Sequence, residues 1–137
     1  AYDLGSANSP RLTNASVRNL AGTGANILIA GFTVAGTGPK PLLIRAVGPK
    51  LAAFGVGGFL ANPKLELYDA KNVKLDENDN WSATLAAIFT SVGAFPLDAN
   101  SKDAALYTVL APGSYTVQVR GADGGTGEAL VEVYEVP

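Results

Sequence analysis

Residues 104–136 read AALYTVLAPGSYTVQVRGADGGTGEALVEVYEV, and they predict three consecutive β-strands. We expect the strands at residues 104–110, 114–120 and 128–136, separated by the turn segments APG and GADGGTG. In the middle strand an apolar set alternates with a polar set: Tyr115, Val117 and Val119 against Thr116, Gln118 and Arg120. This alternation is typical of an antiparallel strand with one buried and one solvated face.

Upstream of residue 104, short apolar runs and glycine-rich turns continue. They predict strands at residues 12–20, 26–34, 41–47, 65–69 and 73–75. The sequence AGTG occurs at residues 21–24 and again at 35–38, where glycines supply the positive φ angles of tight reversals. Because strand 41–47 follows strand 26–34 almost immediately, we expect the two to form a hairpin. Arg45 is the only charged residue in the second of them.

One segment has a helical rather than a β period. Five apolar residues recur with the spacing of one helix face: Trp81, Leu85, Ile88, Phe89 and Val92. Asn80 or Ser82 would be the N-cap, and Gly93 would end the helix. We also expect a single helical turn at residues 49–54.

The predicted fold is all-β. About eight short strands at regular spacing, with one short inserted helix, predict an antiparallel β-sandwich of the jelly-roll or Greek-key type, and a barrel is the alternative. A chain of 137 residues is long enough for one core without further support. We therefore expect a single sandwich domain at residues 11–137, preceded by an N-terminal leader at residues 1–10.

Three residue types are missing from the sequence, and their absence argues against several kinds of catalytic and metal site. The chain contains no histidine, cysteine or methionine. It therefore lacks the commonest general base, the thiolate nucleophile and the usual ligands of zinc, copper and haem. The net charge of −2 is not that of a basic, nucleic-acid-binding protein. The apolar runs are far shorter than the roughly 20 residues that span a bilayer. We expect a non-enzymatic protein that neither binds nucleic acid nor inserts into a membrane.

The charges are unevenly distributed along the chain. Residues 1–64 hold six basic side chains and one acidic, whereas residues 65–137 hold four basic and eleven acidic. If the two halves occupied different ends of the molecule, copies would attract each other head to tail. If strands from both halves interleave, the charges mix within one molecule instead.

The leader, AYDLGSANSP, has the alternation of a short strand, with Tyr2 and Leu4 on either side of Asp3. The sequence GSANSP would act as a hinge that lets Tyr2 and Leu4 reach another subunit and complete its sheet. The alternative is that the leader pairs within its own sheet. The chain begins at Ala1, which favours a secreted product from which a signal peptide has been removed, and an extracellular or cell-surface location. An excised segment of a longer chain is the other explanation of that start.

An acid and amide cluster is the candidate for a cation site. Around Glu77 it offers the oxygen ligands that calcium prefers: Asp76, Asn78, Asp79 and Asn80. The EF-hand pattern fails, because the sixth position is not glycine and Ala87 stands where the bidentate acid is required. One interpretation is a structural calcium with Asp98, Asn100 or Asp103 alongside. The other is a polar loop whose side chains satisfy local backbone groups and cap the helix. No other cofactor is expected.

Several phrases, in order, carry a family resemblance: RLTNASVR, NILIAGFTV, GPKPLLIRAVGPKLAAFGV, LELYDA, NDNW, SKDAALYTVLAPGSYTVQVRG and ALVEVYEVP. Over nearly its whole length the chain resembles a β-rich domain of unknown function that recurs near the C-terminus of large secreted proteins of environmental bacteria. Its second half is also similar to bacterial pre-peptidase C-terminal-type sandwiches, which are appended to secreted proteases. The resemblance implies a secreted β-rich fold and supplies no catalytic residue.

Three functions are compatible with these residues. The favoured one is a non-enzymatic extracellular structural protein that self-assembles, as a homo-oligomer or homopolymer, into a filament or surface layer. The second is a secreted carbohydrate-binding or adhesion module, with or without a stabilising calcium, in which residues 76–81 recognise polysaccharide; Trp81 is nevertheless expected in the core. The third is a small hydrolase that uses paired carboxylates, for which a compact sandwich leaves little room.

Overall fold

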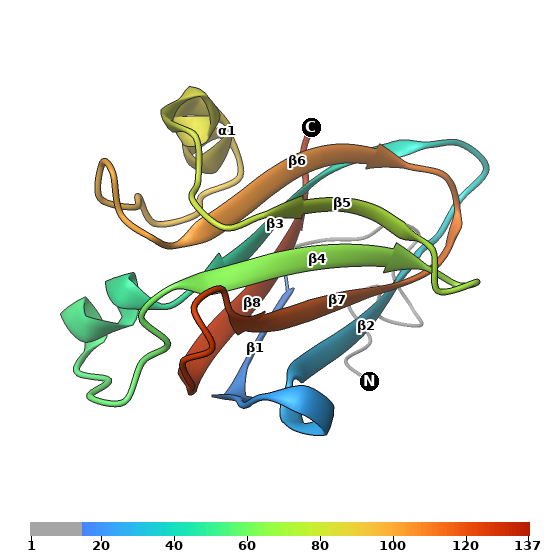
Figure 1. The fold of residues 1–137 in the computed structure, drawn as a ribbon. Coiled ribbons are helices and arrows are strands. Elements are labelled where there is room, and N and C mark those ends of the chain that lie inside the picture. The colour runs from blue at the N-terminus through green and yellow to red at the C-terminus, as the bar shows by residue number, and fades with distance from the viewer. Residues whose placement is uncertain (1–14) are drawn as a thin grey trace.

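Eight strands form two four-stranded sheets in the computed structural model, which describes residues 15–137 (Figure 1). The strands are β1 (Ala15–Ala21), β2 (Leu28–Val34), β3 (Lys40–Val47), β4 (Pro63–Asp69), β5 (Lys74–Asn78), β6 (Ala104–Leu110), β7 (Gly113–Gly121) and β8 (Gly127–Glu135). Sheet A has the order β1-β8-β3-β6, and sheet B has the order β2-β7-β4-β5, with antiparallel pairing throughout. The predicted β-sandwich is confirmed, and the sheets do not close into one barrel. The predicted leader, residues 1–10, lies outside the described residues.

Consecutive strands alternate between the two sheets, except for the β4–β5 pair, which shares sheet B. This is a jelly-roll arrangement. The hairpin predicted between residues 26–34 and 41–47 is therefore wrong. β2 pairs with β7, whereas β3 pairs with β6 and β8, and residues 35–39 cross between the sheets. Both strands place large apolar side chains on their inner faces, so they face each other across the sandwich instead of pairing edge to edge.

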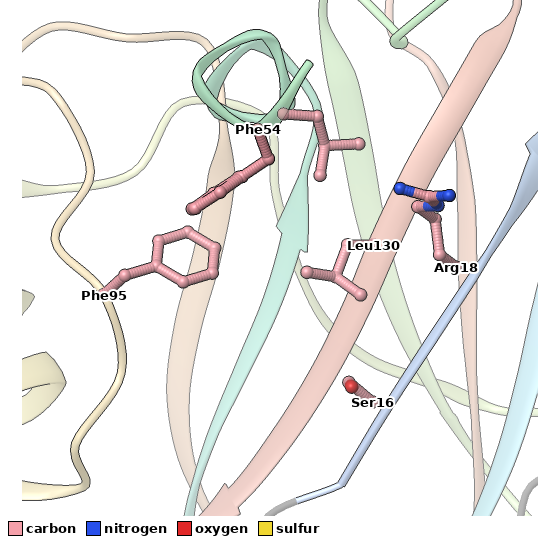
Figure 2. Close-up of a pocket in the computed structure, with 6 residues that line it drawn as sticks. Ser16, Arg18, Phe54, Phe95 and Leu130 are labelled. Carbon is pink, nitrogen blue, oxygen red and sulfur yellow. The ribbon is translucent and has the colours of Figure 1, made fainter. Parts of the chain in front are cut away.

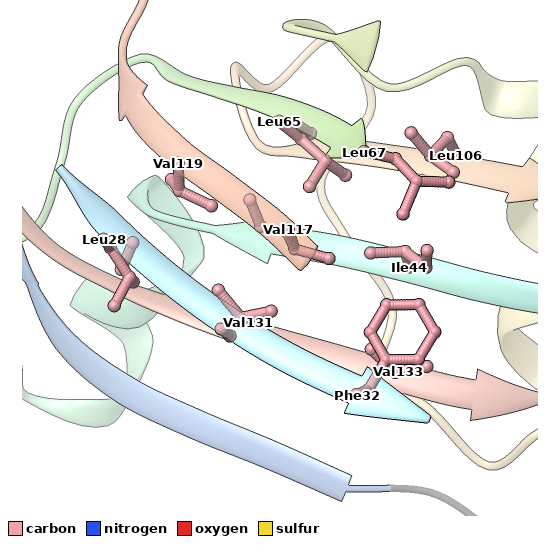
Figure 3. Packing of buried hydrophobic residues seen from close by; sticks show 14 of the residues in the cluster. Leu28, Phe32, Ile44, Leu65, Leu67, Leu106, Val117, Val119, Val131 and Val133 are labelled. Atoms are coloured by element: carbon pink, nitrogen blue, oxygen red, sulfur yellow. The ribbon is translucent and has the colours of Figure 1, made fainter. Parts of the chain in front are cut away.

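The main core fills the space between the sheets. Its members come from every strand except β5, and the large ones include Leu28, Phe32, Ile44, Leu65, Leu106, Val117 and Val131. Figure 3 shows these side chains interleaved between the two layers. Burying each large aliphatic side chain of this kind contributes about 1.5–3 kcal/mol, which makes the interface between the sheets the principal source of stability.

A second apolar cluster covers the outer face of sheet A. Its sheet residues include Leu43 and Val47 of β3, and its covering residues include Leu51 and Phe89. The covering residues come from η2 (Pro49–Phe54) and from the excursion between β5 and β6, which contains η3 (Ala83–Leu85) and α1 (Ala86–Ser91). β3 is therefore buried on both faces, which explains why its sequence is a continuous apolar run without alternation.

The predicted helix at residues 81–92 is realised as η3, which contacts β6, followed by α1 (Figure 1). Ser82 is the N-cap of η3, and its hydroxyl accepts a hydrogen bond from the backbone of Thr84. The predicted turn at residues 49–54 coincides with η2. A further short helix, η1 (Gly24–Asn26), follows β1. None of the helices found between residues 15 and 137 has the length and apolar character needed to cross a membrane.

Strands from the two halves of the chain interleave, so basic residues of the first half form ion pairs with acidic residues of the second half inside one molecule. Four ion pairs each join a basic residue of the first half to an acidic residue of the second: Arg18–Glu128, Arg45–Glu132, Lys50–Asp98 and Lys64–Glu77. Both sheets contain strands from both halves. The charge pattern therefore does not divide the molecule into a basic end and an acidic end.

Candidate functional site

A buried polar network lies on the covered face of sheet A. Arg45 of β3 stands opposite Glu132 of β8 in the strand register. Its Nε donates to Oε1 of Glu132 over 2.8 Å, and its Nη2 lies 2.6 Å from the same oxygen. The hydroxyl of Tyr134 donates to the other carboxylate oxygen over 2.8 Å. The Arg45 side chain is 0% exposed and that of Glu132 is 7% exposed, so this is an ion pair inside the protein.

Two aromatic rings enclose the guanidinium group of Arg45. Its central carbon lies 4.7 Å from the ring centre of Phe89 and 4.4 Å from that of Phe95. Nη1 also donates to the carbonyl oxygen of Phe95 over 2.7 Å. Cation–π contacts of this kind gain strength when water is excluded. Arg45 therefore holds the excursion between β5 and β6 against the sheet.

Sequence reasoning missed Glu132 and Tyr134 as partners of Arg45. The available signal was weak: a single charge in an otherwise apolar strand, and a glutamate flanked by valines. Because Arg45 and Glu132 are 87 residues apart, only the pairing of β3 with β8 brings them together.

The hydroxyl of Tyr134 gives the network a dependence on alkaline pH. Burial first, and then the adjacent Glu132 carboxylate, raise the pKa of Tyr134 above its ordinary value of 10.0. Above about pH 10 the unfolded chain loses this proton while the folded chain keeps it, so the free energy of unfolding falls as the pH rises. We expect Tyr134→Phe to show a shallower fall than the wild type in denaturant titrations between about pH 8 and about pH 11. Equal pH slopes for the two proteins would contradict this assignment.

An open groove of about 420 Å³ lies beside this network, on the outer face of sheet A. Its lining residues come from β1, η2, β8 and the excursion: Ser16, Arg18, Leu51, Phe54, Phe95 and Leu130. Figure 2 shows Phe54 and Phe95 on one side of the groove and Arg18 on the other, with Leu130 between them. The rings of Phe54 and Phe95 meet edge to face, with their centres 5.1 Å apart. The volume is within the range of pockets that bind ligands, about 300–1,000 Å³.

Asp103 fixes the part of η2 that forms the groove wall. This buried carboxylate accepts hydrogen bonds from the backbone of Gly48 over 2.7 Å and of Lys50 over 3.3 Å. Its second oxygen accepts from the hydroxyl of Ser101 over 2.8 Å. Asp103 therefore caps the start of η2 from a distant segment and positions Phe54, which follows at the end of η2.

The proposed calcium ligands lie partly on a strand rather than in a loop. Asp76 and Asn78 belong to β5, because the β4–β5 pairing continues through a β-bulge to Asn78. The amide of Asn78 bridges the sheets: its Oδ1 accepts from the backbone of Ala105 over 3.1 Å, and its Nδ2 donates to the carbonyl oxygen of Asn80. Asp79 accepts from the side chain of Asn80 over 3.2 Å.

Apart from the bond between Asn78 and Ala105 of β6, the hydrogen bonds of these four side chains are to their own segment. Within residues 15–137, no three acidic side chains gather closely enough to hold a metal ion. The side chain of Asp103, proposed as an additional ligand, accepts hydrogen bonds from Gly48 and Lys50 at the start of η2. Calcium binding by Asp76, Asn78, Asp79 and Asn80 stays a prediction.

The third buried carboxylate, Glu66, lies on the outer face of sheet B. It pairs with Arg120 of β7 and with Lys74 of β5, whose ammonium lies 3.3 Å from Oε2. The hydrogen bonds that Lys74 donates to the carboxylates of Glu77 and Glu66 raise the pKa of Lys74. Glu66, Asp103 and Glu132 are thus each engaged by neighbouring donors, and each has a structural role in the described part of the chain.

Trp81 lies where the sequence predicted, against the second core. Its ring centre is 5.1 Å from that of Phe89, and its indole nitrogen donates to the carbonyl oxygen of Asp98 and to the hydroxyl of Ser101. Tyr134 is also buried, whereas Tyr107 on β6 is 41% exposed. The indole ring is therefore partly buried and held in place by these contacts.

No protein-family model matches the chain, and no curated protein matches its sequence. Among solved structures, the chain is similar to the crystal structure of the pre-peptidase C-terminal domain of a collagenase from Bacillus anthracis. The TM-score is 0.53 and the sequence identity is 15%, and the similarity covers 88% of this chain and 89% of that chain. This likeness supports the predicted similarity to pre-peptidase C-terminal sandwiches at the level of the fold.

Proposed function

We propose that the protein is a non-enzymatic extracellular structural subunit whose copies assemble edge to edge into a filament or surface layer. The observation that carries the proposal is the composition of two edge strands. β2 (LIAGFTV) ends sheet B and β6 (AALYTVL) ends sheet A, and neither contains a charged residue or a proline. Within residues 15–137 no strand pairs with the outer edge of either one, although the backbone of Ala105 at the start of β6 donates a hydrogen bond to Asn78. Edges of this kind are templates for pairing with another chain.

Both of these edge strands carry large apolar side chains that are exposed. Ile29 of β2 is 55% exposed, and Tyr107 and Val109 of β6 are 41% and 57% exposed. Soluble proteins usually protect such strands with lysine, proline or an inward-pointing charge. Large exposed apolar side chains beside an open edge favour burial against a partner.

The other two edge strands carry the protection that β2 and β6 lack. β5 (KLDEN) contains Lys74, Asp76 and Glu77, and it is interrupted by the bulge opposite Leu67 and Tyr68. β1 contains Arg18, which pairs with Glu128 at 3.3 Å. Because β1 and β5 contain charged residues and β2 and β6 do not, we expect assembly to use the edges of β2 and β6.

The positions of these edges favour an open chain of subunits. β2 lies next to β1 at one side of the sandwich, and β6 lies next to β5 at the opposite side, as Figure 1 shows. Pairing of β2 in one copy with β6 in the next is a heterologous contact, since different surfaces meet. Such contacts repeat into filaments unless the rotation between copies closes a ring.

Charging the β2 edge tests this proposal. We expect Ile29→Lys/Thr33→Lys to raise the concentration required for assembly at least about tenfold, because each lysine opposes burial of the edge. The matched control is Val73→Lys/Leu75→Lys, at positions that are 54% and 44% exposed beside the already charged β5 edge. Sedimentation velocity reports the assembly state, and circular dichroism checks that each variant is folded.

The proposal fails if the wild type sediments as a monomer at every concentration, or if the β2 variant assembles as readily as the β5 control. An extracellular location is supported by the family resemblance and by the chain's freedom from cysteine and methionine, the two residue types most open to oxidation. The inward packing of Trp81 gives no support to polysaccharide recognition by residues 76–81.

A further inference from the structure

We propose that the groove on the outer face of sheet A is the docking site of the chain's own N-terminal segment, with Tyr2 and Leu4 as the side chains that enter it. This inference goes beyond the edge-strand assembly, because the groove and the β2 edge lie on different sheets. The segment can come from the same copy or from a neighbour, and the chemistry of docking is the same.

The first argument is the position of the segment's attachment point. The described chain begins at Ala15, and the groove is lined by Ser16 and Arg18 of the same strand. Fourteen residues therefore join the molecule at the rim of the groove. From Tyr2 to Ala15 the chain spans at most about 45 Å, enough to turn and lie along the groove. The intervening Gly5 and Pro10 favour such a turn.

The second argument is the match of apolar surface. Four of the six lining residues are large and apolar, and Phe54 among them is 58% exposed. Phe54 and Phe95 form an aromatic corner, and Leu130 forms the floor between that corner and β1 (Figure 2). Tyr2 and Leu4 are the large apolar residues of the predicted leader. Their alternation with Asp3 places both on one face of an extended segment, as a shallow apolar groove requires.

The third argument is charge. Among the described residues that line the groove, Arg18 is the only charged one, and Asp3 is the only acidic residue in the sequence of residues 1–14. The Arg18 side chain is 51% exposed, and among the described residues it pairs with Glu128 through Nε, over 3.3 Å. The guanidinium group has further N–H donors for a second carboxylate. Asp3 is therefore suited to the rim while its two apolar neighbours enter the groove.

Disulfide trapping tests the docking directly, because the natural chain has no cysteine. The test pair is Leu4→Cys with Phe54→Cys in the full chain under mild oxidation. The matched control is Leu4→Cys with Val73→Cys, since Val73 is 54% exposed and lies at the turn between β4 and β5. We expect the test pair to cross-link at least about tenfold faster than the control, since docking raises the local thiol concentration.

A second measurement does not depend on forming a bond between two engineered residues. The single variant Phe54→Cys is labelled with a small thiol reagent, with and without the additional changes Tyr2→Ser and Leu4→Ser. We expect labelling to become at least about threefold faster when the two apolar side chains are removed, because the docked segment shields the groove. The same changes in a Val73→Cys background should leave the labelling rate unaltered.

The outcomes separate this inference from the edge-strand proposal. A cross-link within a monomer, or one that joins copies, supports docking, and mass on a non-reducing gel tells the two apart. A monomeric cross-link in a protein that never assembles supports docking and overturns the edge-strand proposal alone. Docking is overturned if the test pair cross-links no faster than the control and the Phe54→Cys labelling rate is unchanged by Tyr2→Ser/Leu4→Ser.

Discussion

Glu132→Leu is expected to lower the free energy of unfolding by about 3–5 kcal/mol, because it leaves the Arg45 charge buried without its partner. Arg45 is 0% exposed, so water cannot replace the lost carboxylate. The substitution also removes the acceptor of the Tyr134 hydroxyl. Urea unfolding followed by the fluorescence of Trp81, the single tryptophan, measures the change.

Two companion variants identify the cause of that loss. Glu128→Leu breaks the exposed pair with Arg18 and should cost no more than about 1 kcal/mol. Arg45→Met/Glu132→Leu removes both charges of the buried pair and should recover at least half of the loss, because no unpaired charge remains. If the double variant is no more stable than Glu132→Leu alone, the loss comes from packing and not from the orphaned charge.

Gly48→Ala is expected to cost about 3 kcal/mol or more, since there is no space for a side chain at that position. A Cβ atom on Gly48 would lie 2.0 Å from the carbonyl oxygen of Leu60 and 3.1 Å from Cδ of Pro63. The close contact is with backbone, which cannot move aside as the end of a flexible side chain does. The end of β3 would therefore be forced away from the segment that leads into β4.

The matched control for Gly48→Ala is Gly57→Ala, in the glycine-rich segment after η2. A Cβ atom there meets nothing within 4 Å. We expect a change within about 1 kcal/mol, in the stabilising direction, because alanine reduces the freedom of the unfolded chain. Chemical denaturation of both variants makes the comparison. Similar losses for the two would show that glycine flexibility, and not the contact with Leu60, determines the effect.

The C-terminal half of the fold was the most predictable from sequence. The strand expected at residues 104–110 is β6 with the same bounds, and β7 and β8 each begin one residue before the prediction. Alternation is a sound guide where one face is buried and the other solvated, as in β7. In β3 both faces are covered, so the pattern predicted a strand but not its neighbours.

Long-range pairing was beyond sequence reasoning. A short glycine-containing link between two apolar strands is compatible with a hairpin and with a crossing between sheets, and the inner-facing side chains of β2 and β3 select the crossing. Asp76 and Asn78 were expected in a loop because of their polarity. In an edge strand, inward-facing polar residues are tolerated, and Asn78 bonds across to β6.

The groove was unpredictable for the same reason. Its lining comes from β1, η2, the excursion near Phe95 and β8, segments that are adjacent only in the folded molecule. No local pattern distinguishes Phe54 from a core residue. Only the structure shows that this ring is 58% exposed and stands against Phe95 at the groove wall.

Electron microscopy of the unmodified 137-residue chain tests assembly most directly. Edge-to-edge pairing of β2 with β6 predicts regular filaments or ordered layers whose repeat corresponds to one sandwich domain. Charging the β2 edge with Ile29→Lys/Thr33→Lys should abolish them at the same protein concentration. Fields of single particles the size of one 137-residue domain, at concentrations where the protein is folded, would contradict the account.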